Sequence, residues 1–371
     1  MKKDKLLFVI PSLAGGGAER STLNLIKGLV KSYKIVLVLL KKEIKYEIPQ
    51  GLEKLYCLNK KNRWSFFALV FKLLVIVHKE KPPVVFSVLE DAHLVVYFVR
   101  IFVRKKFYWI INDRSIQSIA IRERNFSKIR FLIMKSAYYI ADRIIVVSKA
   151  IKNDLIKNFN VKEDKIAVVY NGVDIEKIQT LAEEEVKDDV FFLPIPKIIS
   201  VGRLEKEKGY DVLLRSFQLL TQKIDSILIL VGDGREKQNL KKLAESLGIK
   251  EKVVFLPFQS NPWKYMKNST VFVLPSKREG FSLVACEAQI CGIPVVATRC
   301  GGVQEIIEDK KTGLLVDVEN VVGLAEAVER ILVDDTLRKN LIENAKQQIK
   351  KFDLDTMIEN YKNIIRGVIV S

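Results

Sequence analysis

Two series of short apolar segments, with room for a helix between most neighbours, constrain the fold of this chain more than any other feature. Each segment is rich in Val, Ile and Leu and is bounded by turn or charged residues, which is typical of strands buried on both faces of a sheet. The first series lies at 5–10, 34–40, 84–88, 107–111, 143–148 and 165–170. The second series lies at 197–202, 226–232, 252–256, 270–274, 294–298 and 313–316.

Strands that alternate with helices predict α/β lobes with parallel, doubly wound, Rossmann-like sheets, and 371 residues are enough for two of them. We expect ligands in the cleft between the two sheets, where the carboxyl ends of the strands face each other. The predicted parts are an N-terminal lobe at 1–175, a polar linker at 176–195, a second lobe at 196–352 and a C-terminal helix at 353–371 that can pack back on the first lobe.

The charge of the chain is unevenly placed. Its formal net charge is +18, and residues 1–150 hold 29 Lys and Arg against 11 Asp and Glu, whereas 151–371 hold 33 of each. A basic lobe attracts anionic partners, which means nucleic acid or phospholipid headgroups. The aromatic residues of this lobe cluster with aliphatic ones instead of alternating with basic ones, so a nucleic-acid binder is the remote alternative and a membrane surface is the expected partner.

No stretch reaches the roughly 20 uncharged apolar residues that span a bilayer. The sequence therefore predicts a cytoplasmic protein, peripheral on the inner face of the membrane, which docks through residues 61–135. Phe66 to Val77 reads equally well as a lipid-facing helix or a buried crossover helix. The basic residues expected to grip lipid phosphates are Arg100 and Arg104 on one helix face, and Arg124, Lys128 and Lys135 on another.

Neither a metal nor a cofactor is predicted. The Asp-x-Asp pair Asp353 and Asp355 begins the last predicted helix, where acidic residues favour the first turn. The two histidines are far apart, and His93 fits a helix residue better than a catalyst. The four cysteines lack the spacing of a structural zinc site and predict reduced thiols.

A glycine-rich loop follows the first predicted strand. The segment 10–20 reads IPSLAGGGAER, and its contiguous glycines allow a backbone to approach a phosphate or a sugar before a helix begins. It lacks the third glycine of a dinucleotide-binding loop and the Gly-Lys-Ser/Thr of a phosphate loop. On its own it reads equally well as a tight turn.

The second lobe contains two more polar constellations. Arg203 directly follows a predicted strand and Lys208 comes five residues later, a placement that suits a diphosphate, although both could also be solvated side chains. Glu279 and Glu287 are separated by seven residues around the start of a helix. A carboxylate in such a turn can accept hydrogen bonds from sugar hydroxyls, a second one can hold ribose, and the helix amides can meet a phosphate.

Together these segments, with YNGVD at 170–174 and LVGDG at 230–234, resemble the large retaining GT-B family often called group 1 glycosyltransferases, over almost the whole chain. The resemblance implies metal-independent transfer of an N-acetylhexosamine or a hexose from a nucleoside-diphosphate donor, with UDP the expected nucleotide. The GGGAER start and the basic first lobe look most like members that extend polyprenyl-diphosphate-linked glycans, including N-acetylgalactosamine transferases. Nucleotide-sugar epimerases share this architecture and are the alternative, although they need no membrane face.

The resemblance also implies residue roles. Arg203 and Lys208 would hold the donor diphosphate, and Glu279 would contact the transferred sugar. Arg114, in the segment INDRS, replaces the histidine that many members carry near the reacting sugar. The implied donor-binding residues are Gly16, Gly17, Arg203, Lys208, Gly280, Phe281, Ser282, Leu283 and Glu287.

Overall fold

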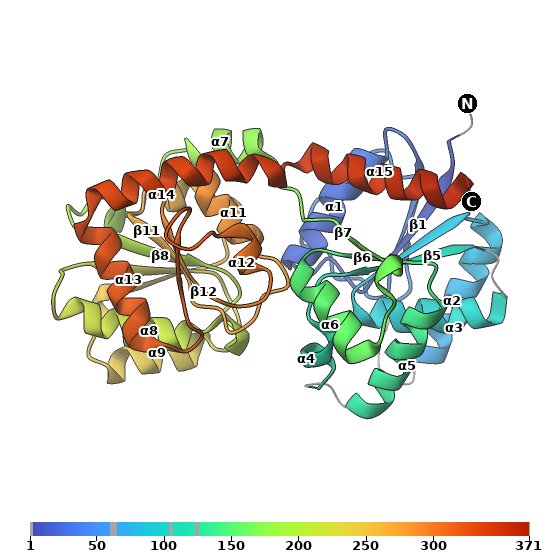
Figure 1. Cartoon of the computed structure of the whole chain (residues 1–371), viewed down its shortest axis with the longest axis horizontal. Helices are drawn as coiled ribbons and strands as arrows, with labels where there is room; N and C mark the ends of the chain where they lie inside the picture. The colour runs from blue at the N-terminus through green and yellow to red at the C-terminus, as the bar shows by residue number, and fades with distance from the viewer. Residues whose placement is uncertain (1–2, 60–64, 104–106, 123–125, 371) are drawn as a thin grey trace. The chain divides into compact units, whose positions relative to one another are not determined.

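The computed structural model describes residues 3–59, 65–103, 107–122 and 126–370. The chain forms two compact units: unit 1 is Met1–Gly172 with Leu354–Ser371, and unit 2 is Val173–Asp353. Each unit is a parallel sheet with helices packed against it (Figure 1). Both sheets are of the predicted α/β, doubly wound kind.

The sheet of unit 1 has seven strands within the described residues, in the order β3-β2-β1-β4-β5-β6-β7. The strands are β1 Lys5–Ile10, β2 Lys34–Leu39, β3 Lys54–Cys57, β4 Val84–Val88, β5 Tyr108–Asp113, β6 Arg143–Val146 and β7 Ile166–Val168. The helices are α1 Gly17–Leu29, α2 Ser65–Glu80, α3 Glu90–Val103, α4 Gln117–Arg122, α5 Ser127–Ile140, α6 Lys149–Phe159 and α15 Leu354–Val370.

The sheet of unit 2 has six strands, in the order β10-β9-β8-β11-β12-β13. They are β8 Lys197–Val201, β9 Ile227–Val231, β10 Val253–Leu256, β11 Val271–Leu274, β12 Val295–Thr298 and β13 Leu314–Val316. The helices are α7 Ile175–Ala182, α8 Tyr210–Thr221, α9 Lys237–Ser246, α10 Trp263–Lys267, α11 Leu283–Ile290, α12 Val303–Ile306, α13 Val321–Val333 and α14 Asp335–Gln348.

The C-terminal helix α15 belongs to the core of unit 1. Its side chains Met357, Tyr361 and Ile365 are buried in the same cluster as Phe8 and Phe86, whose rings stack at 4.5 Å. Figure 1 shows α15 beside α1. The two helices touch closely at Gly28, where an added Cβ would lie 2.2 Å from Cδ1 of Ile358. Packing of α15 on the first lobe is therefore part of the fold.

The predicted strand segments correspond to β1, β2 and β4–β13, and the pattern missed only β3 among the described strands. Where the sequence predicts a linker at 176–195, the structure has α7, a 3₁₀ turn at Asp189–Phe192 and irregular chain. Ile178 and Ala182 of α7 are buried, and this helix packs against α10 and α11. The stretch is thus part of unit 2.

Candidate active site

The order of the strands in unit 2 creates a switch point between β8 and β11. From these two adjacent strands the sheet is built outward in opposite directions, toward β10 on one side and toward β13 on the other. Ligands of doubly wound sheets bind at the carboxyl ends of the strands that flank such a point. The loops that follow these two strands carry Arg203 and Lys208 on one side and Glu279 on the other.

The two loops are joined by backbone contacts. The N–H of Lys277 donates to the carbonyl of Glu207 at 2.9 Å. Gly209 has a φ of +67°, and an added Cβ would lie 2.0 Å from the carbonyl oxygen of Pro275. Only glycine accommodates both the left-handed backbone and this close approach. The glycine that follows Lys208 thus allows the loops to lie against one another.

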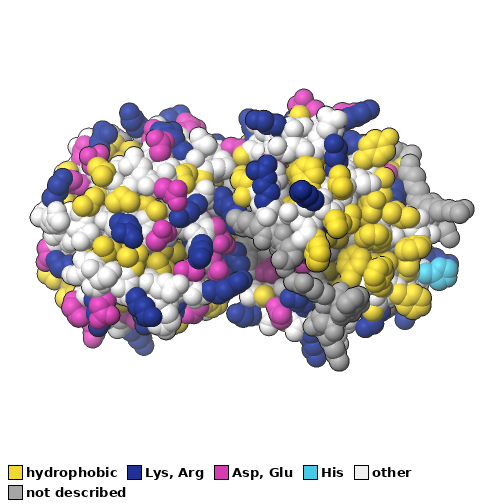
Figure 2. Space-filling model, turned by 90° about the horizontal axis from the view of Figure 1, so that it is seen from below, with side chains coloured by type: hydrophobic (Ala, Val, Ile, Leu, Met, Phe, Trp, Pro, Cys, Tyr) yellow, Lys and Arg dark blue, Asp and Glu magenta, His cyan; other side chains and the backbone are white. Residues whose placement is uncertain are grey.

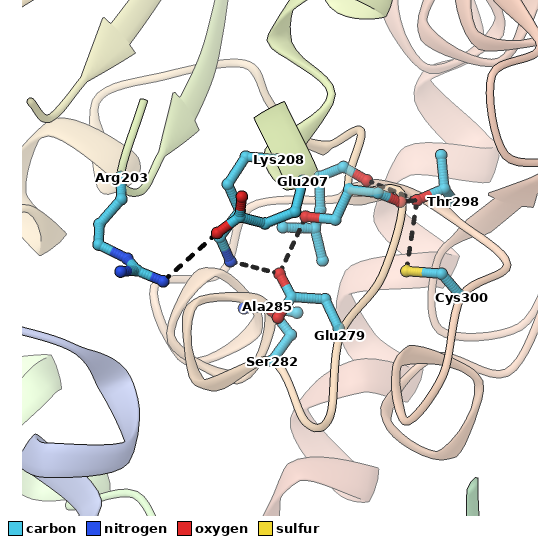
Figure 3. A network of polar contacts seen from close by, with 10 residues as sticks. Arg203, Glu207, Lys208, Glu279, Ser282, Ala285, Thr298 and Cys300 are labelled. Carbon is cyan, nitrogen blue, oxygen red and sulfur yellow. Dashed lines mark hydrogen bonds and ion pairs between the residues drawn. The ribbon is translucent and has the colours of Figure 1, made fainter. Parts of the chain in front are cut away.

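Lys208 and Glu279 form an ion pair at the centre of this loop pair (Figure 3). The Nζ of Lys208 lies 2.6 Å from Oε1 of Glu279, and the side chains are only 19% and 11% exposed. Ser276 Oγ donates to the same oxygen at 2.9 Å. Because both of these hydrogen bonds go to Oε1, the carboxylate is oriented while Oε2 is left for another donor.

Arg203 has a different environment from Lys208. Its side chain is 62% exposed, and its Nη2 lies 3.5 Å from Oε1 of Glu207, which is a long contact for an ion pair. An exposed pair at this distance contributes little to stability. Arg203 is therefore able to move to another anion at small cost.

The helix that follows Glu279 begins with a side-chain cap. Ser282 is the N-cap of α11, and its Oγ accepts a hydrogen bond from the N–H of Ala285 at 3.4 Å. Phe281, buried before the cap, packs edge-on against Phe352. Gly280, Phe281, Ser282 and Leu283 therefore form a fixed turn between Glu279 and the helix.

Glu287 lies in the interior of α11 and is only 2% exposed. The indole N–H of Trp263 donates to its Oε2 at 3.0 Å. A buried carboxylate needs such donors, because leaving it unsolvated and unpaired is costly. The sequence gives no indication that Trp263 and Ser276 contact these two acids. Neither belongs to a motif with the acid that it contacts, so no pattern in the sequence identifies them.

The charge of Glu279 affects the pKa values of two neighbouring groups. Burial raises the pKa of the Cys300 thiol to about 12, and the negative charge of Glu279 adds to this effect. Burial also raises the pKa of Tyr210, again with a contribution from Glu279. Both groups therefore stay neutral at pH 7 and do not compete with Glu279 and Lys208 as charged groups of the site.

The glycine loop of unit 1 carries its own carboxylate cap. Helix α1 begins at Gly17, and the N–H of Gly16 donates a hydrogen bond to Oε2 of Glu19. Ser12 Oγ donates to the other oxygen of Glu19 at 3.3 Å. Glu19 therefore holds the loop against the first turn of the helix.

Arg114 lies just beyond the end of β5 and is 7% exposed. Its Nη1 donates to Ser21 Oγ at 2.6 Å and to Oδ1 of Asn171, which belongs to the YNGVD segment. The structure thus brings together three polar residues, from α1, from the chain after β5 and from the chain after β7. Arg114 is a buried residue of unit 1, and its place beside the reacting sugar stays a prediction.

His93, the histidine of α3, is a buried structural residue. Its ring nitrogens lie 2.8 Å from Ser87 Oγ and 3.1 Å from Asp113 Oδ1. Tyr138 and Gln117 also donate to Asp113. This fully buried network ties β4 and β5 to the helices α3, α4 and α5.

The predicted lipid-binding cations have mixed outcomes. Arg100 is buried, and its Nη2 pairs with Asp142 Oδ2 at 2.7 Å, so the prediction that it faces lipid is wrong. Its guanidinium also donates to the carbonyl of Phe107, which keeps it inside the unit. Arg104 and Arg124 lie outside the described residues. Lys128 and Lys135 are exposed on α5.

Large apolar side chains are exposed on the helices of unit 1. On one side of the unit, Figure 2 shows a broad hydrophobic surface. Helix α2 exposes Phe67, Phe71 and Val75 at a spacing of four residues, while its Leu69, Leu73 and Ile76 are buried. The exposed large apolar residues of the neighbouring helices are Ile101 and Phe102 of α3 and Ile129, Leu132 and Tyr139 of α5. No helix in the described part of the chain is long and apolar enough to cross a membrane.

Comparison with known proteins identifies the class. The family model of group 1 glycosyl transferases matches residues 157–348, and that of glycosyltransferase family 4 matches residues 15–177. The chain belongs to the group 1 glycosyltransferase family and is a glycosyltransferase. Its two sheets form the GT-B fold of these enzymes.

Among the relatives is the Campylobacter jejuni N-acetylgalactosamine-N,N'-diacetylbacillosaminyl-diphospho-undecaprenol 4-alpha-N-acetylgalactosaminyltransferase. It is 34% identical over 361 residues, which cover 94% of this chain and 96% of the relative. The capsular polysaccharide biosynthesis glycosyltransferase CapM of Staphylococcus aureus is 27% identical, with 80% and 79% covered. The fold matches Anabaena HepE in complex with UDP, with a TM-score of 0.83, 22% identity, and 98% and 100% of the two chains covered.

Proposed function

We propose that this enzyme transfers a sugar, an N-acetylhexosamine or a hexose, from a UDP-linked donor to a polyprenyl-diphosphate-linked glycan with retention of anomeric configuration. The observation that carries the proposal is the oriented Lys208–Glu279 pair at the switch point of unit 2. The acceptor class is supported by similarity over nearly the whole chain to a transferase whose name specifies a diphospho-undecaprenol acceptor and an alpha linkage.

The donor diphosphate is assigned to Arg203 and Lys208. Arg203 is exposed and weakly paired, so it can meet a phosphate, and its planar guanidinium suits phosphate oxygens. Lys208 already stands beside a carboxylate and adds a second positive charge. Negative charge grows on the diphosphate as the sugar leaves, and these two cations stabilise it. We propose that this arrangement makes a metal ion unnecessary.

Glu279 is assigned to the transferred sugar. Lys208 and Ser276 fix its Oε1, so that Oε2 is positioned to accept a hydrogen bond from a sugar hydroxyl. Glu287, held by Trp263, is assigned to the ribose. The turn at 280–283 and Gly16 and Gly17 of the other unit are assigned to phosphate and sugar. Arg114 is assigned, with Glu279, Arg203 and Lys208, to the catalytic residues.

We propose that the lipid-linked acceptor lies in an anionic membrane surface on the cytoplasmic face, and that unit 1 contacts this surface. On α5 the exposed residues Lys128, Ile129, Leu132, Lys135 and Tyr139 fall within an arc of about 120° at 100° per residue. Cations that alternate with apolar side chains on one helix face are typical of helices that lie in a membrane interface. Each basic residue near an anionic surface contributes about 1 kcal/mol.

The test is a donor screen with the purified enzyme. Common nucleotide sugars are supplied with a polyprenyl-diphosphate-linked glycan in the presence of EDTA, and release of nucleoside diphosphate and the anomeric configuration of the product are measured. We expect release from one UDP-sugar only when the acceptor is present, and an alpha-linked product. Isomerisation of the donor sugar without acceptor would instead identify an epimerase. Activity that needs added magnesium or manganese would contradict metal independence.

A matched pair of lysines tests the assignment of the diphosphate. Lys208→Met should weaken UDP binding by roughly tenfold or more, because a charge-assisted hydrogen bond is lost, while uridine binding changes little. Lys206, exposed and two residues earlier in the same loop, is the control, and Lys206→Met should bind UDP as the wild type does. Equal UDP affinity of the two variants would contradict the assignment.

A further inference from the structure

Arg114 is a buried cation for which the described protein supplies no counter-charge. Its hydrogen-bond partners are the hydroxyl of Ser21 and the amide oxygen of Asn171, both neutral. Nε and Nη2 are covered and have no hydrogen-bond partner in the described residues. A buried ionised group without a counter-ion destabilises a protein, so its presence calls for a reason outside folding.

The acidic and phenolic groups around Arg114 do not supply its counter-charge. Asp113, its chain neighbour, is held by His93, Gln117 and Tyr138 in a separate network. Burial raises the pKa of Tyr361, so its hydroxyl is neutral at pH 7 even though Arg114 is close enough to act on it. The guanidinium itself remains protonated at neutral pH, although burial lowers its pKa.

Arg100 shows how the same unit treats an arginine that serves only the fold. It is as buried as Arg114, but it pairs with Asp142 at 2.7 Å, donates to the carbonyl of Phe107 and lies over the ring of Phe107. The half-buried Arg130 likewise pairs with Glu90. Unit 1 therefore neutralises these two arginines and leaves Arg114 without a carboxylate in the described residues.

The position of Arg114 is that of a ligand-binding residue. It immediately follows β5, at the carboxyl edge of the sheet where ligands of doubly wound folds bind. Its partner Ser21 belongs to α1, the helix that the glycine loop opens. Neither partner bonds to Nε or Nη2, so both of these donors remain without a hydrogen-bond partner in the described residues.

We propose that Arg114 binds a phosphoryl group of a substrate diphosphate, so that the substrate supplies the counter-charge. Phosphate oxygens match the fork of a guanidinium, and such a pair is strong because it is charged on both sides and shielded from water. The inference rests on the proposed function for its two candidate sources, the diphosphate of the lipid-linked acceptor and that of the nucleotide donor.

Binding and melting measurements on Arg114→Met test this without any transfer reaction, so their outcome is independent of whether the proposed glycan is the true acceptor. The probes are geranyl diphosphate, a water-soluble stand-in for the lipid diphosphate, and UDP. We expect the substitution to weaken one probe by roughly ten- to a hundredfold, the scale of one lost charge-assisted pair. Loss of geranyl diphosphate binding would identify the acceptor as the source, and loss of UDP binding the donor. Arg114→Lys, which keeps the charge, should restore part of the affinity.

The melting temperature separates this role from a structural one. Arg114→Met should melt at or above the temperature of the wild type, since Ser21 still donates to Asn171 at 2.8 Å and an unpaired charge is gone. Arg100→Met should melt well below it, because Asp142 loses its partner. If Arg114→Met does not fold, Arg114→Gln carries the same titrations. Unchanged affinity of the variant for both probes would overturn the proposal.

Discussion

The two units have the same architecture but very different surfaces. Unit 1 contains 35 Lys and Arg against 16 Asp and Glu, and unit 2 contains 27 against 28. Unit 2 pairs exposed charges of opposite sign, as in Lys223–Glu329 and Lys252–Asp225. Unit 1 instead exposes apolar side chains such as Phe67 and Tyr139 on helices that also carry lysines. The two units thus share a fold, while the outer faces of their helices differ in charge and in apolar character.

Replacing the exposed phenylalanines of unit 1 should have the largest effect, because it removes the apolar surface that distinguishes unit 1 from unit 2. If each of Phe67, Phe71 and Phe102 contributes about 1.5 kcal/mol on insertion, changing all three to Ser weakens binding to anionic vesicles on the order of a thousandfold. Co-flotation with such vesicles measures it. Phe192→Ser is the control, because Phe192 is 69% exposed like Phe102 at 67% but lies in unit 2. Undiminished flotation of the triple variant would remove this surface from membrane binding.

Glu279→Gln should lower turnover by about a hundredfold or more, because the site in unit 2 loses a strong contact in the transition state. The fold should survive, since Gln keeps the shape and can still accept from Ser276. Steady-state kinetics and a melting curve measure the two effects. Glu319→Gln, which also removes the partner of a lysine in unit 2, is the control and should leave turnover unchanged. Comparable turnover of the two variants would exclude Glu279 from the chemistry.

Glu80 sharpens the comparison, because it neutralises two of the many cations of unit 1. Burial opposes its ionisation, but hydrogen bonds from Lys5, Lys54 and Tyr56 outweigh this and lower its pKa to about 2. Since the folded pKa is depressed, its stabilisation is complete above the ordinary value of 4.5 and is lost as the pH falls toward 2. Glu80→Gln should therefore cost roughly 2 kcal/mol in the free energy of unfolding at pH 7.

Denaturant unfolding at several pH values measures this effect. The difference between wild type and Glu80→Gln should shrink as the pH is lowered from 4.5 to 2. Glu163→Gln serves as the control, because Glu163 is 73% exposed in its pair with Lys152 and should contribute little at any pH. A difference for Glu80→Gln that stays constant with pH would show that the depressed pKa is not its cause.

The smallest effect concerns the closure of unit 1 by α15. Gly28→Ala gains helix propensity but forces the buried Ile358 to shift, so a net loss of about 1–2 kcal/mol is expected. Gly367→Ala, in α15 where an added Cβ would meet only open space, should instead stabilise by about 0.5–1 kcal/mol. Equilibrium unfolding of the two variants gives the signs. The same sign for both would mean that the α1–α15 contact is not tight.

Continuous apolar runs made most of the fold predictable. Strands buried on both faces, such as Leu6–Ile10 and Ile227–Val231, leave an unambiguous pattern. The edge strand β3 was missed because its residues are exposed or half-buried and include Lys54 and Tyr56. Helix α7 was read as part of a linker because its polar sequence has few buried residues, Ile178 and Ala182.

The site was predictable where a motif places residues in adjacent loops, as for Lys208 and Glu279. The sequence does not reveal which side chains orient them, because Ser276 and Trp263 act through tertiary contacts. Nor does helical spacing distinguish a cation that faces lipid from one that is buried. Arg100 has the spacing of a surface residue. In the structure, however, its guanidinium is buried and donates to Asp142, which lies 42 residues later in the sequence.

The position of α15 bears on how the protein is made. Unit 2 is complete once Asp353 has left the ribosome, whereas unit 1 still lacks Met357, Tyr361 and Ile365 of its core. Chains are synthesised at about 5–20 residues per second and usually fold from the N-terminal domain onward. In this chain unit 2 starts later in the sequence than unit 1, but it is the first unit whose residues have all been synthesised. The basic, apolar-faced unit, although its first residues precede unit 2 in the sequence, acquires its last core helix only after all of unit 2 has been synthesised.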